Sequence, residues 1–163
     1  MQYLGNRLRH EIKYYINEGV YHTLRKRLMT VASPDVNMAV DEGYLISSVY
    51  FDDLYHAALE EKQAGIRFRK KYRLRCYDRW DGHINLECKR KYGEYIAKSS
   101  ARIERREYDA IMAGDYDFLA ERNEAVCREV YALHSARLLR PAVAVEYMRE
   151  AYGGVCFKAF VLF

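Results

Sequence analysis

Five cationic side chains alternate along residues 67–75, which read Arg-Phe-Arg-Lys-Lys-Tyr-Arg-Leu-Arg. Every second side chain of a β-strand lies on the same face. On one face, this segment would place Arg67, Arg69, Lys71, Arg73 and Arg75. Like charges so close repel one another, and guanidinium groups form paired hydrogen bonds with phosphate oxygens. The alternation therefore indicates a polyanionic ligand such as a chain of phosphates. The alternative is a charged face that contacts only solvent.

A second alternating segment follows at residues 84–91, Ile-Asn-Leu-Glu-Cys-Lys-Arg-Lys. It would place Glu87, Lys89 and Lys91 on one face and apolar side chains on the other. Asp81-Gly82 is a typical turn sequence, so the two segments are expected to form a hairpin. Two adjacent cationic strands predict a phosphate-binding sheet.

Two Glu-x-Lys pairs, Glu11 with Lys13 and Glu87 with Lys89, place a carboxylate and an ammonium on the same face of a strand. They are interpreted either as ion pairs that neutralise a polar interior or as a functional pair. In the second case the carboxylates would hold Mg²⁺ or Mn²⁺, which prefer oxygen ligands and bridge to phosphates. Asp52-Asp53 is interpreted as a turn rather than a metal site.

The rest of the chain predicts an α+β fold in which helices interrupt an antiparallel sheet of six or seven strands. Its 163 residues suffice for one domain, spanning residues 1–163. The further strands are expected at residues 7–16, 44–51, 94–103, 142–149 and 155–163. The helices are expected at residues 18–30, after an N-cap at Asn17, and at 54–63, 104–113 and 115–136.

Composition excludes several classes of protein. The four cysteines form no CxxC pair, and the N-terminal residues lack an apolar signal segment, so we expect a cytoplasmic protein with reduced, buried thiols. No apolar run approaches the roughly 20 residues of a membrane helix. Phe68 and Tyr72 would face away from the cations and belong to the core, which argues against base stacking and nucleic-acid binding. No P-loop or dinucleotide-binding motif is present.

Seven short motifs occur in an order that resembles the VTC-type polyphosphate polymerase domain, a branch of the triphosphate tunnel metalloenzymes, over residues 7–152. The motifs are Arg9-x-Glu11-x-Lys13-Tyr14, Ser48-Val-Tyr-Phe-Asp52, Lys62-x-x-Gly65, Arg73-Leu-Arg75-x-Tyr77, Leu86-Glu-x-Lys89, Lys98, and Val145-Glu-Tyr-Met-Arg149.

The resemblance implies an antiparallel β-tunnel of about eight strands that binds ATP, triphosphate and polyphosphate, and a metal-dependent transfer of the γ-phosphate of ATP onto polyphosphate. The phosphate ligands carried over in this way are Lys13, Arg73, Arg75, Lys89, Lys98 and Arg149. Glu11 and Glu87 would hold Mn²⁺ or Mg²⁺. The other cations of these strands, expected to add contacts to the bound phosphates, are Arg9, Arg67, Arg69, Lys71 and Lys91.

Family members, of which this chain resembles the bacterial form, continue with further strands. The comparison therefore predicts that the last strands of the tunnel are lacking here and that exposed strand edges favour a homo-oligomer. Besides polymerisation, two alternatives stay open. One is a non-catalytic polyphosphate-binding module and the other is a triphosphate hydrolase.

Overall fold

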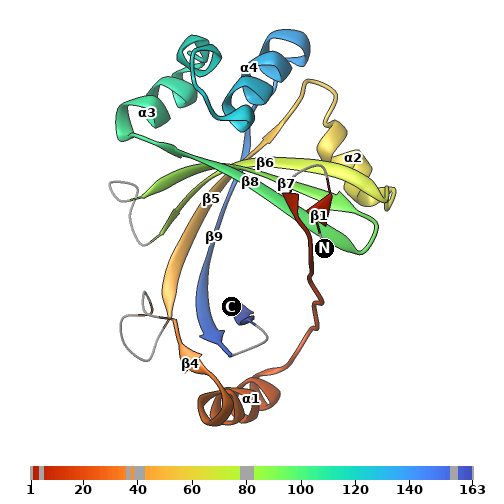
Figure 1. Ribbon diagram of the computed structural model, residues 1–163, viewed down its shortest axis with the longest axis vertical. Coiled ribbons are helices and arrows are strands. Elements are labelled where there is room, and N and C mark those ends of the chain that lie inside the picture. Colours follow the sequence, from red (N-terminus) through yellow and green to blue (C-terminus); the bar gives the residue numbers. More distant parts are fainter. Residues whose placement is uncertain are drawn as a thin grey trace. The chain divides into compact units, whose positions relative to one another are not determined.

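The computed structural model describes residues 2–3, 6–35, 38, 43–77, 83–154 and 158–162 (Figure 1). The chain divides into two compact units. Unit 1 contains Met1–Glu11 and Ser47–Val145, and unit 2 contains Ile12–Ile46 and Glu146–Phe163. The expectation of one domain stays a prediction.

Eight strands are hydrogen-bonded in the order β10-β9-β5-β6-β7-β8-β3, with β4 paired to β9. Their bounds are β3 (Arg9–His10), β4 (Ser33–Pro34), β5 (Tyr44–Asp52), β6 (Phe68–Tyr77), β7 (Ile84–Tyr92), β8 (Tyr95–Ile103), β9 (Arg140–Gly153) and β10 (Lys158–Leu162). A separate pair joins β1 (Gln2–Tyr3) to β2 (Asn6–Arg7). The pairs β6/β7, β7/β8, β3/β8, β4/β9 and β9/β10 are all antiparallel, so the prediction of an α+β fold on an antiparallel sheet is confirmed.

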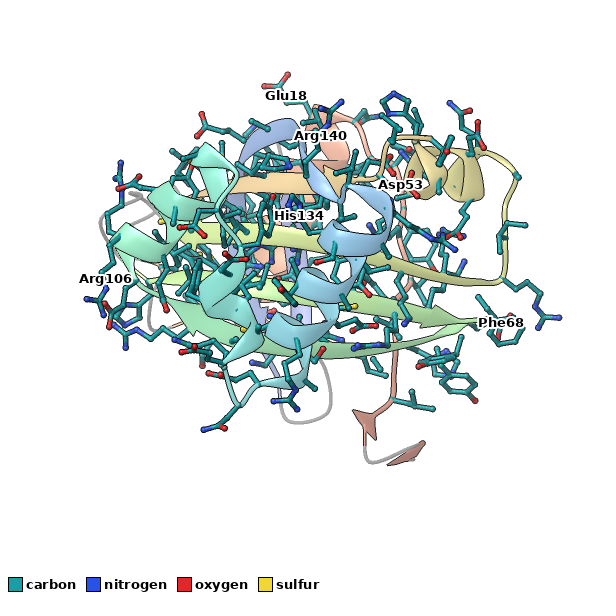
Figure 2. The ribbon with its side chains drawn as sticks, turned by 90° about the horizontal axis from the view of Figure 1, so that it is seen from above. Glu18, Asp53, Phe68, Arg106, His134 and Arg140 are labelled. Carbon is teal, nitrogen blue, oxygen red and sulfur yellow. The ribbon has the colours of Figure 1, made fainter. Side chains whose placement is uncertain are left out.

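In unit 1 the apolar face of β6–β8 is covered by helices. These are α3 (Arg105–Ala113), the 3₁₀ helix η1 (Asp117–Ala120) and α4 (Ala125–Arg137). Figure 1 shows α3 and α4 on one side of these strands, and in Figure 2 Arg106 marks the start of α3 and His134 the later part of α4. Leu74, Leu86 and Cys88 are fully buried beneath the helices, in one cluster with Val126 and Val130 of α4.

The turn between β7 and β8 consists of Gly93 and Glu94, because Tyr92 is directly opposite Tyr95. Gly93 has φ of 63°, which favours glycine in a two-residue hairpin. A Cβ at this position would lie 3.3 Å from the guanidinium of Arg67. The turn thus fixes the register of the two strands. The predicted turn at Asp81-Gly82 lies outside the described residues.

Three expectations about local structure are wrong. The strand predicted at residues 7–16 ends at His10, because among the described residues no strand pairs with those after β3, and their side chains are exposed. The helix predicted at 115–136 is divided into η1 and α4, since the Asp115 carboxylate accepts the backbone N–H of Asp117 and starts a separate turn. Phe68 is 67% exposed rather than buried, and its ring contacts only the edge of Tyr92 among the aromatic rings described.

Asp52 ends β5, and Asp53 begins the predicted turn, because its carbonyl accepts the N–H of His56 at 3.1 Å. The carboxylates of both residues accept backbone N–H groups at the start of helix α2 (Ala57–Gln63), including those of Ala57, Ala58 and Leu59. Both side chains are therefore used to cap a helix. Helix α2 begins three residues later than expected.

Unit 2 contains helix α1 (Glu18–Val31), strands β4 and β10, and the adjoining parts of β5 and β9. The predicted N-cap is confirmed, because the Asn17 side chain accepts the N–H of Val20 at 2.9 Å. Leu28 of α1 packs with Tyr152 and Val161 in a small core. In the part of the chain that the structure describes, no helix is both long and apolar enough to cross a membrane.

Candidate functional site: a cationic sheet face in unit 1

The register of β6, β7 and β8 brings the alternating cations together on the sheet face opposite the helices. Lys71 is directly opposite Lys89, which is directly opposite Lys98. We call these three residues the lysine row. The next row along the strands contains Arg73, Glu87 and Ser100. We call this side of β6, β7 and β8 the basic face. These three strands place one carboxylate on it, that of Glu87. The eight cations that they place on it are Arg69, Lys71, Arg73, Arg75, Lys89, Lys91, Lys98 and Arg102.

Glu87 is the centre of an ion-pair cluster. It is 1% exposed, and one carboxylate oxygen lies 2.7 Å from Nη2 of Arg73 and 4.0 Å from Nε of Arg75. The other oxygen lies 2.5 Å from Nζ of Lys98. One buried anion is thus surrounded by three cations, so the cluster keeps an excess of positive charge.

The electrostatics of the cluster favour the charged forms. Burial opposes ionisation of Glu87, but the charge of Arg73 and the hydrogen bond from Lys98 outweigh it and hold the pKa of Glu87 below its usual value. Burial likewise opposes the charge of Arg73, and Glu87 outweighs it, which raises the pKa of Arg73. The pair is therefore ionised at neutral pH.

Two hydroxyl groups of β5 orient the arginines. Arg73 donates from Nη1 to the Tyr50 hydroxyl at 2.9 Å, and its guanidinium lies 5.7 Å from the centre of the Tyr50 ring. Arg75 is 7% exposed and donates to the Ser48 hydroxyl at 3.4 Å. Sequence reasoning missed this role of Ser48 and Tyr50, although their alternation in the Ser48-Val-Tyr50 motif was the available signal.

Both glutamates of the two Glu-x-Lys pairs contact cations of other segments of the chain. Lys89 lies 2.7 Å from Glu11, while Glu87 pairs with β6 and β8. Spacing along a strand does not reveal which side chain faces it on the neighbouring strand. The ion-pair interpretation fits the geometry of both glutamates, and each of them has a cationic partner from another segment of the chain.

The other predicted ligands of unit 1 lie at one end of this face or next to it. Arg69 donates to the carbonyl of Ile66 at 2.7 Å, and Arg9 of β3 is directly opposite Ile96 of β8. Lys91 faces the same Ile96 from β7. Arg67 is exposed and precedes β6, and its carbonyl accepts the N–H of Gly93.

Lys13 and Arg149 belong to unit 2. Lys13 is exposed and lies in neither helix nor strand. Arg149 hydrogen-bonds to the Tyr44 hydroxyl, and its guanidinium lies 4.7 Å from the ring centre of Tyr44 and 4.8 Å from that of Phe160. Their assignment as phosphate ligands stays a prediction, as does that of the residues on the basic face.

The carboxylates expected to hold a metal do not fit that role in this arrangement. Both oxygens of Glu87 are bound by cations, which repel a divalent ion. Glu11 faces Lys89. Among the described residues, no group of three His, Cys, Asp or Glu side chains is arranged to hold a metal ion.

Two solved structures are similar to this chain. A protein from Hippeastrum, named as a candidate adenylyl cyclase for which a dominant triphosphatase activity is described, matches 96% of this chain and 70% of its own, with a TM-score of 0.60 and 13% identity. A candidate adenylate cyclase from Vibrio parahaemolyticus matches 94% of this chain at a TM-score of 0.49 and 11% identity, and this chain spans 65% of its length. At such identities the likeness to the Hippeastrum protein shows the fold alone, an antiparallel α+β fold.

The family of this chain is identified by a match of its sequence to a family model. The model of the VTC domain matches residues 8–155, and the chain belongs to this family. No curated protein sequence matches it.

Proposed function

We propose that the basic face of unit 1 binds a chain of linked phosphates, as in tripolyphosphate, ATP or polyphosphate. The lysine row is the observation that carries this proposal. Neighbouring strands lie about 4.8 Å apart, and like charges directly opposite one another destabilise a sheet. Glu11 pairs with Lys89, and Glu87 pairs with Lys98. The row and the neighbouring arginines still carry more positive than negative charge, and a polyanion would balance this excess.

The lysines and the arginines of the basic face differ in exposure, so we assign them different roles in phosphate binding. The side chains of Lys89 and Lys98 are 30% and 34% exposed, so they are partly accessible to phosphate oxygens, although each ammonium group also pairs with a carboxylate. Arg73 and Arg75 are 14% and 8% exposed and are held by hydroxyl groups and by Glu87. Each charge-assisted contact to phosphate contributes about 1.5–3 kcal/mol when partly desolvated.

For the whole protein we propose transfer of a phosphoryl group from ATP to polyphosphate, which the VTC family supports. Such a transfer needs little covalent help, so the role of the arginines and lysines is to orient the phosphates and neutralise the charge that develops on them. Enzymes of the triphosphate tunnel class generally use divalent metals. We assign no step to a metal, because Glu11 and Glu87 do not fit one.

Hydrolysis of triphosphate is the second candidate, supported by the activity described for the Hippeastrum protein of the same fold. The products distinguish the candidates. Synthesis converts ATP into ADP and a lengthening polyphosphate, whereas hydrolysis releases orthophosphate from tripolyphosphate without polymer. Binding without either product would indicate a polyphosphate-binding module. Among the described residues, the buried cysteines Cys76, Cys88 and Cys127 form no disulfide, which fits the cytoplasmic location that we propose.

Titration calorimetry with tripolyphosphate tests the binding site. Lys71→Gln should weaken binding about tenfold by removing one charge-assisted contact. The matched control is Lys62→Gln, which removes the same charge from an exposed position on α2 and should change affinity less than twofold. If both variants weakened tripolyphosphate binding equally, the binding would depend on the overall charge of the protein and not on the basic face. Competition by RNA as strong as that by polyphosphate would contradict the ligand class.

A further inference from the structure

Directly behind the lysine row lies a second pair of like charges. Lys70 of β6 is directly opposite Arg90 of β7, on the sheet face that the helices cover. Lys71 and Lys89, one position along, form the like-charged pair of the basic face. The two strands therefore carry two repelling pairs at adjacent positions, at a spacing of about 4.8 Å.

Glu129 of α4 bridges the rear pair. One carboxylate oxygen lies 2.5 Å from Nζ of Lys70, and the other contacts Nη2 of Arg90. Arg90 also donates from Nη1 to the hydroxyl of Ser99 on β8, at 2.7 Å. The network thus connects α4 to all three strands of the basic face.

The core of unit 1 places Glu129 over the sheet. Val126 and Val130 are buried on the side of α4 that faces the strands, and Glu129 lies beside them at helical spacing. Partial burial opposes the charge of Glu129, but the hydrogen bond from Lys70 and the charge of Arg90 outweigh it and hold the pKa of the carboxyl below its usual value. The bridge is therefore ionised at neutral pH.

We propose that Glu129 is a positioning residue of the phosphate site, which acts by holding β6 and β7 together behind the lysine row. This inference rests on the proposed function. Glu129 lies on the opposite face from the bound phosphates and contacts none of them. It sets the separation of Lys71 and Lys89, and that separation matters for linked phosphates but not for a single phosphate.

The test compares two anions in the full chain. Glu129→Gln should weaken the binding of tripolyphosphate about tenfold and that of orthophosphate less than threefold, which lowers the ratio of the two affinities. If only net charge mattered, Glu129→Gln would bind both anions more tightly rather than more weakly, because the loss of an acidic group strengthens the attraction of anions. Glu121→Gln is the matched control. It removes the same charge from an exposed position ahead of α4 and should leave the ratio unchanged.

A double variant tests the reason for the bridge. Lys70→Gln combined with Glu129→Gln removes one of the two repelling cations and should recover at least half of the lost tripolyphosphate affinity on a logarithmic scale. If Glu129→Gln does not fold, Glu129→Asp takes its place, because it keeps the charge but shortens the bridge, and the same fall in the ratio is expected.

An unchanged ratio in a folded Glu129 variant, or a double variant no better than the single one, overturns the inference while leaving the proposed function intact. A wild-type chain that binds neither anion overturns the proposed function, and the inference with it.

Discussion

Each unit buries a glutamate, and the two carboxylates have different surroundings. Glu150 of β9 in unit 2 is 0% exposed and accepts hydrogen bonds from the hydroxyls of Tyr21 at 2.8 Å and Tyr152 at 2.6 Å. Its cation is Arg25 of α1, at 3.0 Å. Glu87 in unit 1 is equally buried but faces three cations.

The difference separates a structural ion pair from a binding site. Glu150 balances Arg25 one to one, and its remaining acceptor capacity is used by two phenols, so α1 is attached to β9 by a neutral cluster. Burial and the hydrogen bond to Glu150 raise the pKa of Tyr152 to about 12, so this phenol stays a donor. Glu87 leaves its cluster positively charged. A buried glutamate thus stabilises a fold when its charge is matched, and prepares an anion site when it is outnumbered.

The largest effect is expected in unit 2. Glu150→Leu leaves Arg25 and two phenols without their acceptor, and should lower the free energy of unfolding by about 4 kcal/mol. Urea denaturation measures this loss. Tyr21→Phe removes a single hydrogen bond and should cost only about 1 kcal/mol. Similar losses for both variants would mean that the cluster does not act as a charge pair.

A smaller and ligand-dependent effect is expected for Glu87→Gln. The variant loses the anion beside Arg73 and Lys98 but keeps an amide acceptor, so we expect a loss of about 2 kcal/mol in the ligand-free chain. Saturating tripolyphosphate should restore most of it, because phosphate oxygens would replace the missing charge. Thermal unfolding with and without the anion provides the measurement. If tripolyphosphate restored the stability of Glu150→Leu to the same degree, the two glutamate clusters would not differ in anion binding.

The smallest effect is a pH dependence. The pKa of Glu87 is lower in the folded chain than its ordinary value of 4.5, so its charge stabilises the fold above that pH, and the contribution is lost as the pH falls through the folded value. The difference in urea midpoint between wild type and Glu87→Gln should be constant from pH 7 to about 5 and shrink below it. Other acidic groups cancel in this difference. If the difference in urea midpoint did not change with pH, the effect of Glu87→Gln would come from altered packing and not from the lost charge.

Periodicity predicted the parts of the fold whose partners are close in sequence. The strands around Arg73, Glu87 and Lys98 follow one another closely in the sequence, and the first two alternate cleanly, so their common face could be expected. Residues 11–16 have the same alternation, but no strand of the described part of the chain pairs with them, and propensity alone does not form a sheet.

The site was less predictable than the strands because its contacts depend on register. Nothing in the sequence indicates that Glu87 faces Arg73, or that Lys71, Lys89 and Lys98 share a row. Glu129 lies more than thirty positions from these residues in a helix with many charged side chains, and only packing distinguishes it. Sequence patterns therefore predicted which types of side chain form the site, but their partners could be identified only from the tertiary structure.

The lysine row also has a consequence for how this sequence can change over generations. Like charges directly opposite one another disfavour a sheet, and Glu11 and Glu87 offset only part of the positive charge of this face. Selection for folding alone would therefore not maintain lysines at positions 71, 89 and 98. A descendant that no longer met anionic ligands would be expected to lose these lysines early while it kept Leu74, Leu86 and the rest of the buried cluster. Loss of the row in a related sequence with an intact core would then mark a change of function rather than the decay of the fold.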